Sequence, residues 1–172
     1  MNNINILILF RFLFIVTSQI LIFNNLLIFG INPNIYLIFL IIFPLNYNKS
    51  FMYLCVFIAG LVLDSFSNSY GIITFSLLLS SAFRPYFLKF SFGHFDASKV
   101  RKTSDYIKET SLYQKLTFLV LMFFSHQLIL YSIEAFSLEK FSWIFKKTIL
   151  STIISIILTY IFILIFFNKN AR

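Results

Sequence analysis

Charged residues are scarce in this chain of 172 residues, where Asp, Glu, Lys and Arg together make up 12%. Soluble domains usually carry about twice that share, roughly 25%. Hydrophobic residues make up 59% of the chain, and a soluble domain of this composition could not cover its surface with polar groups. The composition therefore predicts an integral membrane protein.

The residues that build most catalytic and metal sites are also few. The single cysteine, Cys55, cannot form an intrachain disulfide, and no set of residues has metal-ligand spacing. No nucleophilic serine motif and no glycine-rich phosphate loop is present. Four glycines in all leave few places where backbone could approach a ligand closely. We therefore expect no enzymatic activity, no metal and no cofactor.

Long apolar runs are what the sequence does contain, and six can be drawn: 4–23, 31–45, 51–66, 71–90, 114–135 and 142–167. At ~1.5 Å per residue the second and third runs reach only ~22–24 Å, short of a hydrocarbon core of ~30 Å. Either their flanks extend them or their ends lie inside protein. We predict an all-α polytopic bundle of about six transmembrane helices, with two short central ones, as a single domain over residues 1–172. Five spans result if the second run is only interfacial.

Topology is the better explanation for the net charge of +8 than nucleic-acid binding, because the basic residues flank the apolar runs. Arg11 interrupts the first run and no cleavage site follows, so we expect this run to be kept as a span. With the N-terminus inside, eleven of the fourteen Lys and Arg residues fall on the inner side. Both termini are therefore predicted to be cytoplasmic. The polar loop at about 91–113 is a solvated inner loop, or it lies against anionic lipid head groups or a cytoplasmic partner.

Asp64 is the most informative single residue. It ends the third run four residues after Gly60, and a Ser/Asn-rich turn leads from it to Gly71. A carboxylate at the bilayer centre costs roughly 2.5–3.5 kcal/mol on insertion scales, so such a group usually has a partner or a role. Three interpretations remain open: a wetted helix-end carboxylate, a structural ion pair, and proton or cation handling. An ion pair would most readily involve Lys147 or its neighbour Lys146.

Other polar residues in the apolar runs predict packing rather than chemistry. Glu134 competes with Asp64 for the same two lysines, and Trp143 fits an interfacial anchor. Arg84 lies ~20 Å along the next helix from Gly71, too far from Asp64 to pair, and is expected to snorkel towards lipid head groups. Pro85 leaves a helix carbonyl without its donor and predicts a kink.

Two groups of residues predict contacts between helices. His126 and Gln127, near the middle of the fifth run, are expected to form interhelical hydrogen bonds rather than a metal site. Small hydroxyl residues spaced 4, 3 and 4 form a seam typical of a membrane helix interface along the sixth run: Thr148, Thr152, Ser155 and Thr159.

Three segments resemble the MreD family of rod-shape-determining proteins: residues 19–46, GLVLDSFSNSYGI at 60–72 and AFRPYFLKFSFG at 82–93. The resemblance covers roughly residues 18–95. The recognisable elements are the Asn32–Pro33 turn, Asp64 between Gly60 and Gly71, and the Arg84–Pro85 pair. Ile73 and Thr74 stand where family members often carry a His-Ala pair.

The resemblance implies a non-catalytic component of the cell-elongation machinery in the bacterial inner membrane. Such proteins associate with a bitopic MreC-like protein. Through it they connect to the MreB-like filament and to the glycosyltransferase and penicillin-binding transpeptidase that synthesise the wall. MreD-like bundles are also similar in fold to substrate-binding subunits of energy-coupling-factor vitamin transporters, which makes a small-molecule transport subunit the alternative. An intramembrane enzyme of lipid metabolism would need clustered acids or a histidine pair, and the sequence has neither.

Overall fold

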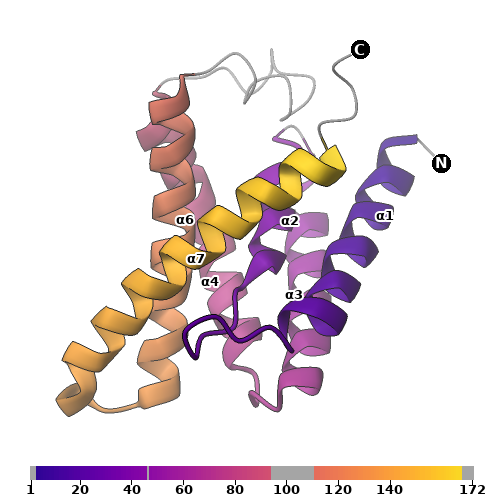
Figure 1. Cartoon of the computed structure of the whole chain (residues 1–172). Coiled ribbons are helices and arrows are strands. Elements are labelled where there is room, and N and C mark those ends of the chain that lie inside the picture. Colours follow the sequence, from indigo (N-terminus) through magenta and orange to yellow (C-terminus); the bar gives the residue numbers. More distant parts are fainter. Residues whose placement is uncertain (1–2, 46, 94–110, 168–172) are drawn as a thin grey trace.

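The computed structural model describes residues 3–45, 47–93 and 111–167 (Figure 1). Helices make up 83% of the described residues and no strand occurs among them, which confirms the all-α prediction. In chain order the elements are α1 (Asn3–Ser18), the π-helical turn η1 (Gln19–Phe23), the 3-10 turn η2 (Ile35–Leu37), α2 (Ile38–Ile42), α3 (Lys49–Ser67), α4 (Ile72–Phe92), α6 (Leu112–Ala135), the 3-10 turn η3 (Leu138–Lys140) and α7 (Phe141–Phe167).

Within the described part of the chain, four segments are long and apolar enough to cross a membrane: Ile6–Phe23, Lys49–Ser67, Leu112–Ala135 and Phe141–Phe162. Helix α4 has a similar length of 21 residues but a more polar sequence, with four serines, Arg84 and Lys89. These lengths and compositions are those of a multi-pass membrane protein. Most of the loop predicted at about 91–113 lies outside the described residues, which resume one residue before α6.

The second apolar run forms a much shorter helix than the others. Helix α2 has five residues, so at ~1.5 Å per residue it spans only ~8 Å. Leu37, Ile38 and Leu40 have no exposed surface, and the flanking Ile35 and Phe43 are also buried. Its ends therefore lie inside protein, which is one of the two solutions open to a short apolar run. The third run is instead extended by its flanking residues, so that α3 has 19 residues and is ~28 Å long.

The long helices pack as sequential neighbours, with α4 between α3 and α6, and α7 against α6. Figure 1 shows α7 running obliquely across the face of the bundle, with α2 behind it. Helix α1 begins, and α7 ends, at the same end of the bundle. The opposite end, which we call the turn end, holds the α3–α4 connection (residues 68–71) and the α6–α7 connection (residues 136–140).

Candidate functional site

Asp64 caps the helix that follows its own. It lies in the last turns of α3 with 7% of its surface exposed. Its carboxylate accepts hydrogen bonds from the backbone N–H groups of Ile73 at 3.0 Å and Thr74 at 2.9 Å, and from the hydroxyls of Ser69 and Thr74. Ile73 and Thr74 belong to the first turn of α4, where backbone N–H groups lack intrahelical acceptors and the helix dipole favours negative charge. Asp64 thus ties the start of α4 to the end of α3.

Two glycines permit this joint between α3 and α4. A Cβ atom at Gly60 would lie 2.6 Å from the Cα atom of Thr74, so only glycine lets the two helices approach this closely. Gly71 is the N-cap of α4 with φ of 90°, a left-handed conformation that favours glycine. Asn68 ends α3 in the left-handed region, and its N–H donates to the Asp64 carbonyl. Gly60, Asp64 and Gly71 therefore act together to fix the packing of α3 against α4.

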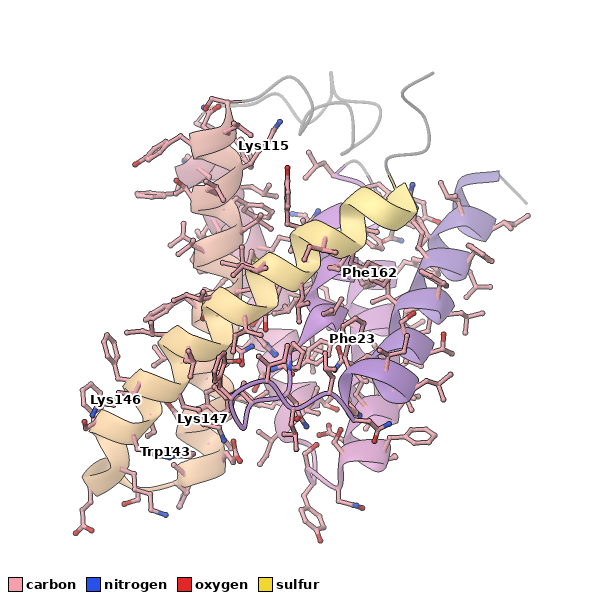
Figure 2. The ribbon with its side chains drawn as sticks, viewed as in Figure 1. Phe23, Lys115, Trp143, Lys146, Lys147 and Phe162 are labelled. Atoms are coloured by element: carbon pink, nitrogen blue, oxygen red, sulfur yellow. The ribbon has the colours of Figure 1, made fainter. Side chains whose placement is uncertain are left out.

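The predicted contact between Asp64 and a lysine was wrong. Lys147 instead lies 3.5 Å from a carboxylate oxygen of Glu134, and its ammonium lies 4.5 Å from the ring centres of both Tyr131 and Trp143. Figure 2 shows Lys147 and Trp143 near the start of α7. Asp64 needs no cation, because four protein donors already satisfy its two oxygens. Those donors and its burial also exclude the wetted helix-end interpretation.

Arg84 does not snorkel to a lipid surface, contrary to the prediction. It is 5% exposed, its Nη2 donates to the Phe43 carbonyl, and its Nη1 lies 3.7 Å from the Met52 sulfur. The Phe43 carbonyl follows the last turn of α2, where carbonyls lack intrahelical donors. The guanidinium supplies a donor there, which holds α4 against the end of α2. Helix α4 continues through Pro85.

Gln19 is a structural residue that the sequence analysis did not single out. It begins the π-helical turn η1 and is 1% exposed. Its Nε2 donates to the Pro33 carbonyl and to Asn24 Oδ1, both at 3.0 Å. Its Oε1 accepts from the backbone N–H groups of Ile35 at 2.8 Å and Tyr36 at 3.3 Å. The Pro33 carbonyl is therefore one of the groups that Gln19 binds. The available signal in the sequence was an amide near the end of the first apolar run.

His126 and Gln127 form the interhelical hydrogen bonds that the sequence predicted. Both are fully buried. His126 Nε2 lies 2.8 Å from the Tyr36 hydroxyl and its Nδ1 3.2 Å from Ser80 Oγ. The Gln127 carbonyl oxygen accepts from Asn34 Nδ2 at 2.9 Å, while Gln127 Nε2 has no partner among the described residues. These bonds join α6 to α4 and to the segment before α2.

The hydroxyl seam of α7 also faces the bundle interior. Ser155 accepts a hydrogen bond from the backbone N–H of Asn34 at 3.1 Å. The other members of the seam are buried as well, as expected for a helix interface: Thr148, Thr152 and Thr159. Small side chains at this spacing let α7 lie close to its neighbours.

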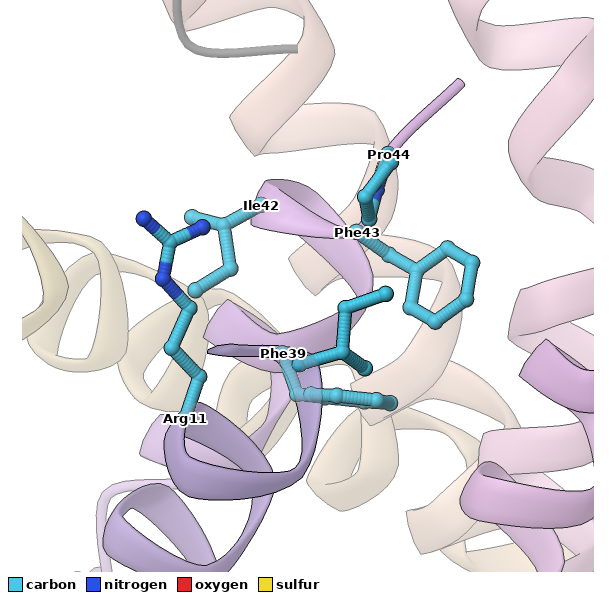
Figure 3. A pocket seen from close by; sticks show the side chains of 6 residues that line it. Arg11, Phe39, Ile42, Phe43 and Pro44 are labelled. Atoms are coloured by element: carbon cyan, nitrogen blue, oxygen red, sulfur yellow. The ribbon is translucent and has the colours of Figure 1, made fainter. Parts of the chain in front are cut away.

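An open hollow lies at the turn end and has a volume of about 380 Å³. Three segments form its walls: the loop 24–34, the α3–α4 turn, and the facing ends of α6 and α7. Its polar wall includes Asn24, Asn32, Asn34, Asn68, Glu134 and Lys147. A second hollow, beside Arg11 at the end of α2, is open but holds only about 10 Å³, the space of roughly one water molecule (Figure 3).

No group of three or more His, Cys, Asp and Glu side chains is placed to hold a metal ion within residues 3–45, 47–93 and 111–167. Comparison of the chain with family models, with curated proteins and with solved structures finds no match. The fold and the site therefore define only a class: a helical multi-pass membrane protein with a tight α3–α4 joint and, beside it, an open pocket lined by polar and apolar residues.

Proposed function

We propose that the chain is a non-catalytic component of the cell-elongation machinery in the bacterial inner membrane. In this proposal it binds an MreC-like bitopic protein. Through that partner it positions the glycosyltransferase and penicillin-binding transpeptidase of lateral wall synthesis relative to an MreB-like filament. The proposed topology has six crossings with both termini cytoplasmic, and the crossing at residues 31–45, which includes α2, is embedded in protein. Anionic lipid is a further proposed partner.

The observation that carries the proposal is the joint between α3 and α4. The residues that resemble the MreD family at 60–72 act together, because Asp64 caps α4 while Gly60 and Gly71 allow the turn. Arg84, from a second resembling pair (Arg84–Pro85), holds the other half of α4 against the end of α2. Residues whose contacts fix helix positions fit a scaffold better than a catalyst.

The turn end supports docking of a partner there. Three aromatic residues in its loops are almost fully exposed: Phe29 at 86%, Tyr70 at 96% and Phe136 at 93%. Each has a positive φ, which is uncommon for a bulky side chain and which clusters at functional sites. An aromatic side chain that points outward from a strained backbone is suited to insert into a partner surface or the membrane interface.

Affinity purification from a bacterial host in mild detergent tests this proposal. We expect the protein to recover an MreC-like partner, and the double variant Tyr70→Asn/Phe136→Asn to recover less of it. Asparagine tolerates the left-handed backbone, so this change removes the aromatic rings without adding strain. Tyr113→Asn is the matched control, because Tyr113 is 79% exposed in the first turn of α6, at the opposite end. Recovery of an ATPase-coupled transport module in place of an MreC-like partner would overturn the proposal.

A small-molecule transport subunit of the energy-coupling-factor type is the second candidate, and the pocket at the turn end favours it. A volume of about 380 Å³ is within the range of small-molecule sites, ~300–1,000 Å³. The same purification separates the two functions, because each predicts a different partner.

A further inference from the structure

The pocket at the turn end carries one positive and one negative side chain, Lys147 and Glu134. They come from facing helices, α7 and α6, and their charged atoms are 3.5 Å apart. Charged hydrogen bonds are usually about 2.7–2.9 Å long, so this ion pair is longer than a charged hydrogen bond. No hydrogen bond joins the two groups or connects either to another described residue. Both groups retain hydrogen-bonding capacity for a ligand.

The lysine is held in place on its other side. Its ammonium lies against the faces of Tyr131 and Trp143, at 4.5 Å from each ring centre. Such contacts stabilise a cation and limit the directions in which the side chain can move. Lys147 is also half-buried, while Glu134 remains accessible at 46%. The pocket is therefore lined by a held positive group with an accessible negative group beside it.

We propose that this pocket binds an α-amino acid with an apolar side chain, whose ammonium meets Glu134 and whose carboxylate meets Lys147. Two opposite charges 3.5 Å apart match a ligand whose own charges are separated by only one carbon atom. The pocket carries no net charge from these two groups, so a zwitterion leaves no charge uncompensated. A ligand with one charge alone would pair with one of the two groups and draw it away from the other, which would then lack a partner.

The remaining wall fits the side chain of such a ligand. Leu27, Ile31, Ile72, Ile73 and Leu130 give the pocket apolar surface. The volume of about 380 Å³ is near the lower end of the ~300–1,000 Å³ range of small-molecule sites. That space accepts a leucine- or phenylalanine-sized ligand together with several waters. The asparagine amides of the loop 24–34 can bind those waters or the ligand carboxylate.

Equilibrium binding of radiolabelled L-leucine and L-phenylalanine to the purified full-length protein in detergent tests the proposal. We expect saturable binding that unlabelled amino acid displaces. Glu134→Gln and Lys147→Gln should each weaken the affinity at least tenfold. Lys146→Gln should leave it unchanged, since Lys146 is the exposed neighbour of Lys147 and leaves α7 on the other side, away from the pocket (Figure 2).

Ligand analogues test the same point on the unchanged protein, so the result does not depend on whether a variant folds. N-acetyl-L-phenylalanine lacks the ammonium and L-phenylalanine methyl ester lacks the carboxylate, and neither should displace the labelled ligand. Displacement by both analogues, absence of saturable binding, or displacement by glucose instead would overturn the proposal. The assay contains no partner protein, so its failure leaves the MreC-like interaction untouched, and a failed partner purification leaves this binding result standing.

Discussion

Replacing Asp64 with asparagine tests the capping role of its carboxylate with almost no change in volume. The carboxylate accepts four hydrogen bonds, two at each oxygen. The asparagine amide keeps only one accepting oxygen. Depending on its orientation, its NH₂ group faces either the two donors of Thr74 or the donors of Ser69 and Ile73. One backbone N–H in the first turn of α4 is left without an acceptor, which costs ~1–3 kcal/mol. Loss of negative charge at the helix N-terminus adds ~0.3–2 kcal/mol. We expect Asp64→Asn to lower the free energy of unfolding by about 1.3–5 kcal/mol.

The measurement is unfolding of the purified protein in detergent, followed by far-UV circular dichroism over a titration with denaturing detergent. Ser65→Ala is the matched control. Ser65 is exposed beside Asp64 and bonds only to the Leu61 carbonyl in its own helix, so its loss should change stability by less than ~0.5 kcal/mol. An Asp64→Asn protein within ~1 kcal/mol of the unchanged protein would refute the capping role.

Three further substitutions follow from the same contacts. Gly60→Ala places a Cβ atom against the Thr74 backbone and should destabilise the protein by about 1–3 kcal/mol in the same titration, with Ala59→Gly as a comparison that adds no bulk. Gln19→Leu leaves the backbone N–H of Ile35 without its side-chain acceptor and should cost about 1–3 kcal/mol, and an unchanged midpoint would contradict it. Tyr70→Asn relieves a bulky side chain at φ of 51° and should raise stability by about 0.5–1 kcal/mol, whereas a loss would show that the ring packs in the folded protein.

The apolar runs predicted most of the helix bounds, for a physical reason. A membrane-length helix must be apolar over nearly its whole length, so the sequence shows both of its ends. The fifth run, 114–135, corresponds to α6 at Leu112–Ala135, and the third, 51–66, to α3 at Lys49–Ser67. The length of the helix in the second run was harder to predict, because an apolar segment buried in protein has the same sequence pattern as one buried in lipid.

The partners of the buried charged groups could not be read from the sequence. Helix geometry gives the height of Arg84 along its helix, and this correctly separates it from Asp64. The height of a residue along its helix does not show which backbone groups lie opposite it. Both residues bind backbone groups: Arg84 donates to the Phe43 carbonyl, and Asp64 accepts from the N–H groups in the first turn of α4. Backbone donors and acceptors exist at every residue, so a search for side-chain partners overlooks them.

The joint at Asp64 and the pocket beside it are physically connected, and this decides which variants can separate the proposals. The Ser69 hydroxyl and the Ile73 backbone N–H both donate hydrogen bonds to the Asp64 carboxylate, and both residues line the pocket. Loosening the joint therefore moves one wall of the pocket and the exposed Tyr70 together. If an Asp64 variant loses both partner recovery and ligand binding, the result shows only that the fold is disturbed, and it tests neither proposal. Glu134 and Lys147 belong to α6 and α7, across the pocket from the joint, so their variants change the ligand site while the α3–α4 turn keeps its contacts.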